Sequence, residues 1–204
     1  WPDPAVTPWA LERRTQPNIE PFPPLGALVG GHEWRTLVVV AGLMMGKTQA
    51  LCEFIEREYP AHDGAGNPHA NFLAGSPRII AVSCRRSFAR DFLRRFAPLG
   101  FKSYEDIRTS RVRDRRVIVQ VESLTRLDVR GDPPDVLIVD EAVSVVLQLC
   151  SPHVRSPHDV VELFHWLMRK ARKVIFLDAF MGEQALNVLL DARSHVDKKT
   201  GKKS

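Results

Sequence analysis

Three consecutive residues, Gly46, Lys47 and Thr48, carry the clearest chemical pattern in this sequence. They follow the apolar run VVVA at 38–41 and precede a segment with helical spacing. They match the end of a phosphate-binding loop, G-x-x-x-x-G-K-[ST], with Ala41 in place of its first glycine. In such a loop backbone N–H groups at a helix N-terminus hold phosphate oxygens, a lysine adds positive charge and a hydroxyl binds Mg²⁺. The pattern predicts an ATP site made of Ala41, Gly42, Leu43, Met44, Met45, Gly46, Lys47 and Thr48.

A second candidate is the run LIVDE at 137–141, in which an apolar strand leads directly into Asp140 and Glu141. Asp140 is expected to hold Mg²⁺, usually through water, together with Thr48. Glu141 is expected to orient or deprotonate an attacking water, while Lys47 stabilises phosphate charge. The two motifs together predict an Mg²⁺·ATP site, whereas a lone Asp-Glu pair would also suit a solvent-facing strand end.

Met44 and Met45 are unusual in a loop of this kind. A phosphate loop bends sharply, and glycine adopts positive φ without steric cost. A side chain forced into such a conformation costs about 1–3 kcal/mol. The sequence therefore supports nucleotide binding more firmly than hydrolysis. It leaves open a non-catalytic DNA- or protein-binding module with a degenerate loop.

The elements that must position these residues alternate between strand and helix. Apolar runs at 36–40, 78–83, 116–121, 136–139 and 174–177 predict strands, and helices are expected at 47–59, at 87–96, from Ser156 onward and at 182–192. Ser156 is expected to cap its helix. Nearly all-apolar strands that alternate with helices predict an α/β fold, with a mostly parallel sheet covered on both faces. Ligands of such sheets collect at the carboxyl ends of the strands. Those ends carry the 46–48 loop, the run SCRR at 83–86, Glu122 with Ser123, Asp140 with Glu141, and Asp178.

The remaining composition sets the limits of the domain. Seven of the 15 prolines fall within the first 30 residues, which predicts a proline-rich irregular arm over 1–34. An ATP-binding domain is expected over 35–192, followed by a basic, disordered tail over 193–204. No apolar run approaches the roughly 20 residues of a membrane span, so no membrane partner is predicted. The chain begins with Trp1 rather than Met, which suggests a fragment of a longer protein.

Positive charge is concentrated along the chain. Residues 85–116 contain 11 basic and 4 acidic residues. A concentrated basic surface favours a polyanion, with nucleic acid the leading candidate, although charged runs also serve as plain solvated surface. Cys52, Cys84 and Cys150 lack metal-ligand spacing and are expected to be buried, reduced thiols of an intracellular protein.

Several longer segments resemble a known family. The runs AGLMMGKT, VSCRRSF, VQVESLTRL, LIVDEAVSVVLQLCSP and FLDA are similar, in this order, to the first motor domain of herpesvirus-type replication origin-binding proteins, which are superfamily 2 DNA helicases. The resemblance covers about 37–190. It implies a P-loop NTPase with a RecA-like three-layer α/β/α domain and ATP and Mg²⁺ as cofactors.

The resemblance also assigns roles by position. It implies DNA-backbone contacts at Ser83, Arg85, Arg86, Ser87, Glu122 and Ser123. Asp178 and Ala179 fall where the family couples ATP hydrolysis to DNA movement, and Phe180 departs from the small hydroxyl residue often found there. The family closes its ATP site with an arginine from a second RecA-like domain. Because no such domain follows in this sequence, we expect a partner domain in cis or trans, and a nuclear or viral replication compartment as the place of action.

Overall fold

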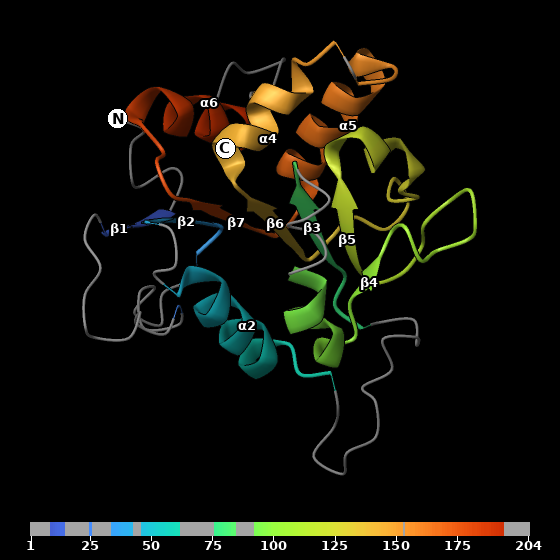
Figure 1. Ribbon diagram of the computed structural model, residues 1–204, viewed down its shortest axis with the longest axis horizontal. Helices are drawn as coiled ribbons and strands as arrows, with labels where there is room; N and C mark the ends of the chain where they lie inside the picture. Colours follow the sequence, from blue (N-terminus) through green and yellow to red (C-terminus); the bar gives the residue numbers. More distant parts are fainter. Residues whose placement is uncertain are drawn as a thin grey trace, which may run out of the picture.

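A single sheet of parallel strands organises the protein. The computed structural model describes residues 9–14, 25, 34–42, 46–61, 76–84, 92–152 and 154–193, with the backbone alone for 9–14. The seven strands lie in the order β1-β2-β7-β6-β3-β5-β4 (Figure 1). Their bounds are β1 Trp9–Arg14, β2 Thr36–Ala41, β3 Ile79–Ser83, β4 Lys102–Ser103, β5 Arg116–Gln120, β6 Val136–Asp140 and β7 Lys173–Asp178. All the strand pairings are parallel, which confirms the predicted sheet.

Helices cover both faces of this sheet. On one face lie α4 Ala142–Leu149, α5 Pro157–Lys170 and α6 Glu183–Arg193; on the other lie α2 Lys47–Glu58 and the helical residues 92–96 (Figure 1). Short 3-10 segments, η1 Ala97–Leu99 and η2 Val121–Arg126, complete the described elements. The result is a three-layer α/β/α arrangement.

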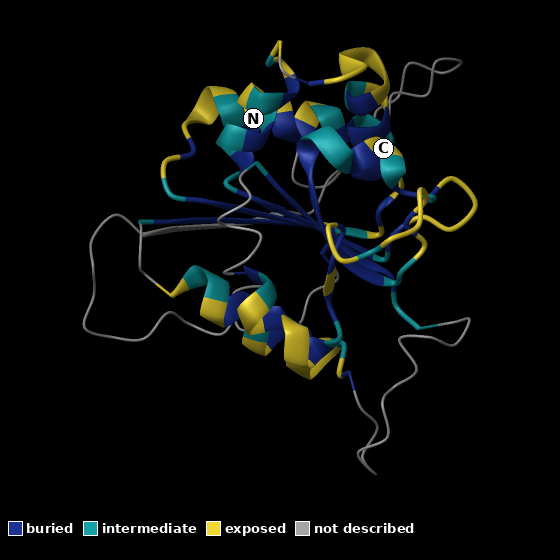
Figure 2. Cartoon of the chain, turned by 45° about the vertical axis from the view of Figure 1, so that its right-hand side comes forward, coloured by how far each residue is buried: buried dark blue, intermediate teal, exposed yellow. Residues whose placement is uncertain are grey.

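The core explains why the strands read as unbroken apolar runs. Side chains of successive strand residues point to opposite faces, so Val38 packs in the cluster under α4, α5 and α6 while Leu37 packs in the cluster over α2. Every residue of β2, β3, β5 and β6 is buried as a consequence. Figure 2 shows the buried strands between helices whose outer faces are exposed.

Several predictions about local structure need correction. Residues 1–34 were expected to be irregular, which is wrong for 9–14 because β1 pairs with β2 from Trp9↔Thr36 to Arg14↔Ala41. The short edge strand β4 and the helix α4 were not predicted from the sequence. Ser156 does precede α5, but it adopts φ 51° and its side chain makes no capping hydrogen bond.

Two arginines from the basic segment are structural rather than ligand-facing. Arg116 is buried, and its guanidinium donates hydrogen bonds to the carbonyl oxygens of Leu99 and Tyr59 at 2.6 and 2.7 Å. Burial lowers the pKa of this guanidinium. Arg115 pairs with Asp132 at 2.7 Å. Part of the positive charge counted along the sequence therefore serves to tie loops to the sheet.

Among the described helices, none combines the length and the apolar character needed to cross a bilayer.

Candidate nucleotide site at the strand ends

The phosphate-loop residues lie between β2 and α2. β2 ends at Ala41 and α2 begins at Lys47, whereas Leu43, Met44 and Met45 fall outside the described residues. Gly46 has φ 83°, a left-handed conformation that glycine adopts without strain. The first turn of α2 has no side-chain cap and no acidic residue. Its N–H groups, which a helix N-terminus leaves unpaired, are suited to an anion.

Lys47 occupies the first position of this helix. Its Nζ donates a hydrogen bond to the carbonyl oxygen of Ala41 at 3.3 Å, so the amine turns back across the mouth of the loop. Thr48 follows and is half-buried. Lys47, predicted to bind phosphate, and Thr48, predicted to bind the metal, therefore both lie beyond the carboxyl end of β2.

The register of the sheet brings two aspartates to the same edge. Val40 pairs with Asp178, and Leu177 pairs with Asp140, so β7 lies between the loop strand and the Asp-Glu strand. The charge of Lys47 acts on Asp140, where it lowers the carboxyl pKa against the larger effect of burial. Lys47 and Asp140 therefore lie at the same edge of the sheet.

Asp140 is a buried carboxyl group with one oxygen that lacks a partner among the described residues. Its side chain is 2% exposed, and burial raises its pKa to about 7. Oδ1 accepts a hydrogen bond from the Glu141 N–H at 3.0 Å, but the buried Oδ2 has no donor among the described residues. A buried carboxylate oxygen without a partner is costly unless a cation or donor reaches it.

These residues fit a hydrated Mg²⁺. The described part of the chain contains no cluster of three or more His, Cys, Asp or Glu side chains that could hold a metal ion. Mg²⁺ in nucleotide sites needs no such cluster, because one or two protein oxygens, waters and substrate phosphates complete its shell. Asp140 and the hydroxyl of Thr48 are the protein oxygens available for that role.

Glu141 is held in an unusual conformation. It adopts φ 49° and ψ 55° as the residue preceding α4, a region that non-glycine residues enter at some cost. Its Oε2 accepts a hydrogen bond from the Cys84 thiol at 3.3 Å. Cys84 follows β3, so the carboxylate predicted to activate water is oriented from the neighbouring strand.

Asp178 acts as a cap for α4. Its Oδ2 accepts the N–H of Val143 at 2.8 Å, and its Oδ1 accepts the N–H of Phe180 at 2.8 Å. A carboxylate at a helix N-terminus satisfies an unpaired N–H and complements the helix dipole. Ala179, which lies between Asp178 and Phe180 in the chain, is half-buried, whereas the Phe180 side chain is 80% exposed.

The predicted DNA-contact residues divide into three groups. Ser83 is buried at the end of β3, and its Oγ has no partner among the described residues. Arg85, Arg86 and Ser87 lie outside the described residues. Glu122 and Ser123 are half-buried in η2, and the Glu122 Oε1 accepts a hydrogen bond from the Gln148 amide of α4 at 2.6 Å.

Sequence reasoning missed the residues that link these motifs. Cys84 was expected to be a buried, reduced thiol, yet it is half-buried and donates a hydrogen bond to Glu141. Cys150 is exposed, so its expected burial is wrong. Gln148 lies in the run LIVDEAVSVVLQLCSP that resembles the family, but no role was predicted for it. The position of Cys84 directly after a strand was the one available clue, because strand ends gather the polar residues of this sheet.

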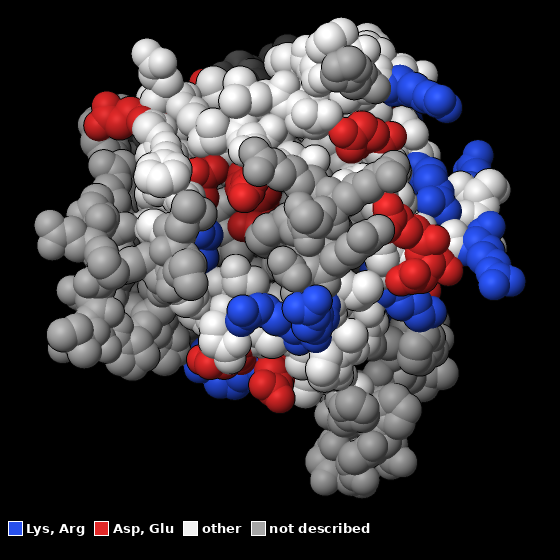
Figure 3. Space-filling view, in the orientation of Figure 1, with Lys and Arg blue, Asp and Glu red and all other residues white. Residues whose placement is uncertain are grey.

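The surface beside β4 and β5 carries charges of both signs. Figure 3 shows basic and acidic side chains interspersed on the described surface at the right of the view. Lys102 pairs with Asp114 at 2.8 Å, and Arg113 with Asp128 at 2.8 Å. Residues 92–116, the described part of the basic segment, therefore do not form a single-sign patch on this surface.

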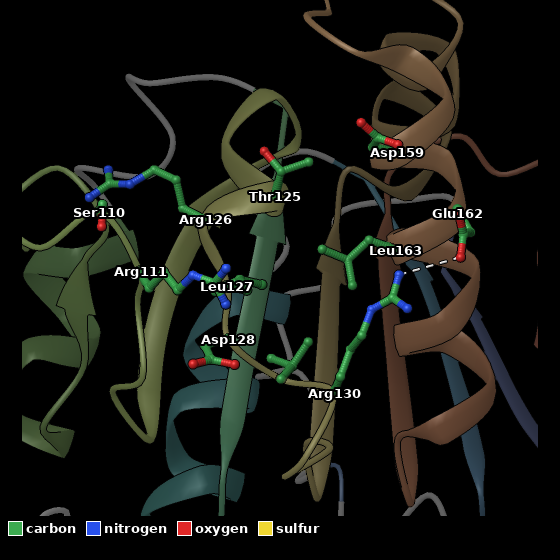
Figure 4. A pocket seen from close by; sticks show the side chains of 11 residues that line it. Ser110, Arg111, Thr125, Arg126, Leu127, Asp128, Arg130, Asp159, Glu162 and Leu163 are labelled. Atoms are coloured by element: carbon green, nitrogen blue, oxygen red, sulfur yellow. Dashed lines mark hydrogen bonds and ion pairs between the residues drawn. The ribbon is translucent and has the colours of Figure 1, made fainter.

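A hollow of about 530 Å³ lies between η2, the 127–130 segment and α5 (Figure 4). Arg130 and Glu162 form an ion pair at its wall, at 3.4 Å. Its other charged lining residues are Arg111, Arg126, Asp128 and Asp159. None of the residues predicted as a site from the sequence lines it, and its charges largely balance.

Comparison with known proteins places the chain in a family. A family model described as "Origin of replication binding protein" matches residues 31–198. The replication origin-binding protein of bovine herpesvirus 1.1 (strain Cooper) is 35% identical over 167 residues, which cover 78% of this chain and 18% of that protein. An African swine fever virus protein (strain Badajoz 1971 Vero-adapted) named for a helicase/primase complex is 33% identical over 161 residues, which cover 79% of this chain and 14% of that protein. The chain thus spans less than a fifth of either relative.

A solved structure supports the fold. The complex of Saccharomyces cerevisiae Dbp5 with Nup159, Gle1, IP6 and ADP contains a chain that aligns with a TM-score of 0.56 at 13% identity, over 79% of this chain and 42% of that one. This likeness shows the RecA-like α/β/α fold that the sequence predicted. Because the family model matches residues 31–198, which include the strand-end residues described above, the chain belongs to the origin of replication binding protein family.

Proposed function

We propose that the chain is the ATP-binding first motor domain of an origin-binding-type DNA replication helicase. The observation that carries this proposal is the unpartnered Oδ2 of the buried Asp140. Asp140 ends β6, which is separated from β2 by β7 alone, and the charge of Lys47 acts on its carboxyl group. A buried carboxylate oxygen without a hydrogen-bond donor destabilises the fold, and a bound cation would remove that cost. The family relationship supports the same assignment.

Each residue has a task in this proposal. The N–H groups at the start of α2 bind phosphate oxygens, and Lys47 exchanges its contact with Ala41 for the β and γ phosphates. Thr48 and Asp140 hold the ion. Mg²⁺, when bound, neutralises charge on the phosphates. Glu141 orients or deprotonates the attacking water, and Asp178 with Ala179 couples the nucleotide state to movement of the domain.

Contacts with the DNA backbone are proposed for Ser83, Arg85, Arg86, Ser87 and Ser123. Glu122 was predicted among them, but a carboxylate repels phosphate, and this one is bonded to Gln148. A positioning role suits it better. Turnover is proposed to need an arginine from a second RecA-like domain, in cis or trans. Action in a viral replication compartment stays a prediction.

Nucleotide affinity with and without Mg²⁺ tests this assignment. Lys47→Ala removes a charge-assisted contact of about 1.5–3 kcal/mol, so the ATP dissociation constant is expected to rise roughly 10- to 150-fold. Lys170→Ala, an exposed lysine at the end of α5, is the matched control and should bind ATP like the wild type. Equal ATP affinity of wild type and Lys47→Ala would show that the nucleotide site is misassigned.

Two further measurements separate the motor from a non-catalytic module. Phosphate release is measured with and without single-stranded DNA and with a second motor domain supplied in trans. Turnover above background that is lost in Glu141→Gln supports the motor, whereas binding without turnover under all conditions supports the module. DNA affinity that falls steeply with salt supports backbone contacts.

A further inference from the structure

The helix α4 is attached at both ends to segments for which DNA contacts are predicted. At its start, Glu141 accepts the thiol hydrogen bond of Cys84, which follows β3. Near its end, Gln148 donates to Glu122, which follows β5. β3 and β5 are neighbours, with Ser83 paired to Gln120, so both attachments come from adjacent strand ends.

The bond between Glu122 and Gln148 is the stronger of the two attachments. At 2.6 Å it is a short hydrogen bond from an amide to a carboxylate, whereas the Cys84 thiol is a weak donor to Glu141 at 3.3 Å. The other carboxylate oxygen, Oε2, is buried and has no partner among the described residues. Among the described residues, the Gln148 amide is therefore the hydrogen-bond donor that orients this carboxylate.

α4 carries this contact to the nucleotide site. Gln148 lies seven positions after Glu141, which corresponds to about 10 Å along a helix. Ala142, Val145 and Leu149 anchor the helix in the core, and its first backbone hydrogen bond runs from the Val145 N–H to the Glu141 carbonyl oxygen at 2.9 Å. A shift of the Gln148 end is transmitted to Glu141 because a short, anchored helix moves as one unit.

DNA phosphates would act directly on this connection. A phosphate bound beside η2 or the end of β3 repels the Glu122 carboxylate and favours its contact with Gln148. We propose that Gln148 is a positioning residue, which with Glu122 makes α4 the link between DNA bound at these strand ends and Mg²⁺·nucleotide bound beside Glu141. This inference rests on the proposed function and adds the residues that couple its two ligands.

Linkage between the two ligands provides the test. The dissociation constant of a non-hydrolysable ATP analogue with Mg²⁺ is measured with and without a saturating single-stranded oligonucleotide of mixed sequence. The wild type is expected to show a ratio of about fivefold or more, the usual lower range of coupling between sites. Gln148→Ala and Gln148→Glu should bring the ratio to within about twofold of one while each ligand still binds alone.

A swap of the two side chains makes the test specific. In the double variant Glu122→Gln with Gln148→Glu, an amide again faces a carboxylate, but residue 122 has no charge for a phosphate to repel, so the coupling ratio should stay near one. Leu147→Ala, a change at an exposed neighbour on the same helix, should keep the wild-type ratio.

The inference is overturned by a wild-type ratio near one, by full coupling in Gln148→Glu, by full coupling in the swapped double variant, or by equal loss of coupling in Leu147→Ala. A wild type that binds no nucleotide would instead refute the proposed function itself.

Discussion

The buried carboxylate of Asp140 should make the stability of the metal-free protein depend on pH. Burial raises its pKa from 3.8 to about 7. The unfolded chain therefore releases this proton near pH 4 while the folded chain keeps it until near pH 7. The contribution of Asp140 is most favourable below pH 4 and is lost as the pH rises through 7. At 1.36 kcal/mol per pKa unit, the full cost at pH 8 is about 4 kcal/mol.

Asp140→Asn isolates this effect because asparagine does not titrate. Its amide leaves a constant cost of about 1–3 kcal/mol if its N–H₂ finds no acceptor. The free energy of unfolding of the variant minus that of the wild type should fall by about 2–3 kcal/mol between pH 8 and pH 5. The constant cost of the asparagine amide decides whether the variant is more or less stable than the wild type at pH 8. It does not affect how the difference in stability changes with pH.

Urea unfolding in chelator-containing buffer at both pH values measures this difference, and the slope m should be unchanged. A difference that stays constant between pH 8 and pH 5 would refute the reasoning, because Asp140 would then ionise in the folded state as it does in the unfolded chain. Addition of Mg²⁺·ATP should stabilise the wild type and not the variant.

Further outcomes concern other residues. Asp178→Ala should lower stability by about 1–2 kcal/mol in urea unfolding, since it removes the cap of α4, whereas Phe180→Ala should change it by less than about 0.5 kcal/mol; equal effects would contradict the capping role. Arg193 is buried, its pKa is lowered to about 10 by burial, and it donates to the carbonyl oxygens of Met168 and Arg172. Arg193→Ala should cost about 2 kcal/mol net in the same assay, because two carbonyl groups lose their donors; an unchanged midpoint would speak against it. Burial, followed by Glu56 and Glu53, raises the pKa of the Cys52 thiol, so iodoacetamide at pH 8 should label exposed Cys150 well before Cys52, as followed by mass spectrometry. Similar labelling rates would contradict this order.

The regular elements were predictable where local pattern and burial agree. β2, β3, β5, β6 and β7 each lie within one residue of the predicted bounds, because a strand buried on both faces is apolar throughout. β1 was missed because its WALERR sequence is polar at half its positions, and its place in the sheet comes from pairing with β2. α4 was missed because it is short and rich in valine, a residue that favours strands. Its helical form depends on the buried Ala142, Val145 and Leu149 and on the cap from Asp178.

The sequence by itself determined which residues stand at the ends of the strands, since apolar runs and the polar residues after them are local properties of the chain. It thereby indicated the fold class and the candidate residues Lys47, Asp140 and Glu141. The tertiary structure decided which of these ends are neighbours. The order of strands places β7 between β2 and β6, and it places Cys84 beside Glu141, 57 residues away. Strand order follows from packing between distant segments, which no local pattern encodes, so the bonds from Asp178, Cys84 and Gln148 to the site emerged only from the folded chain.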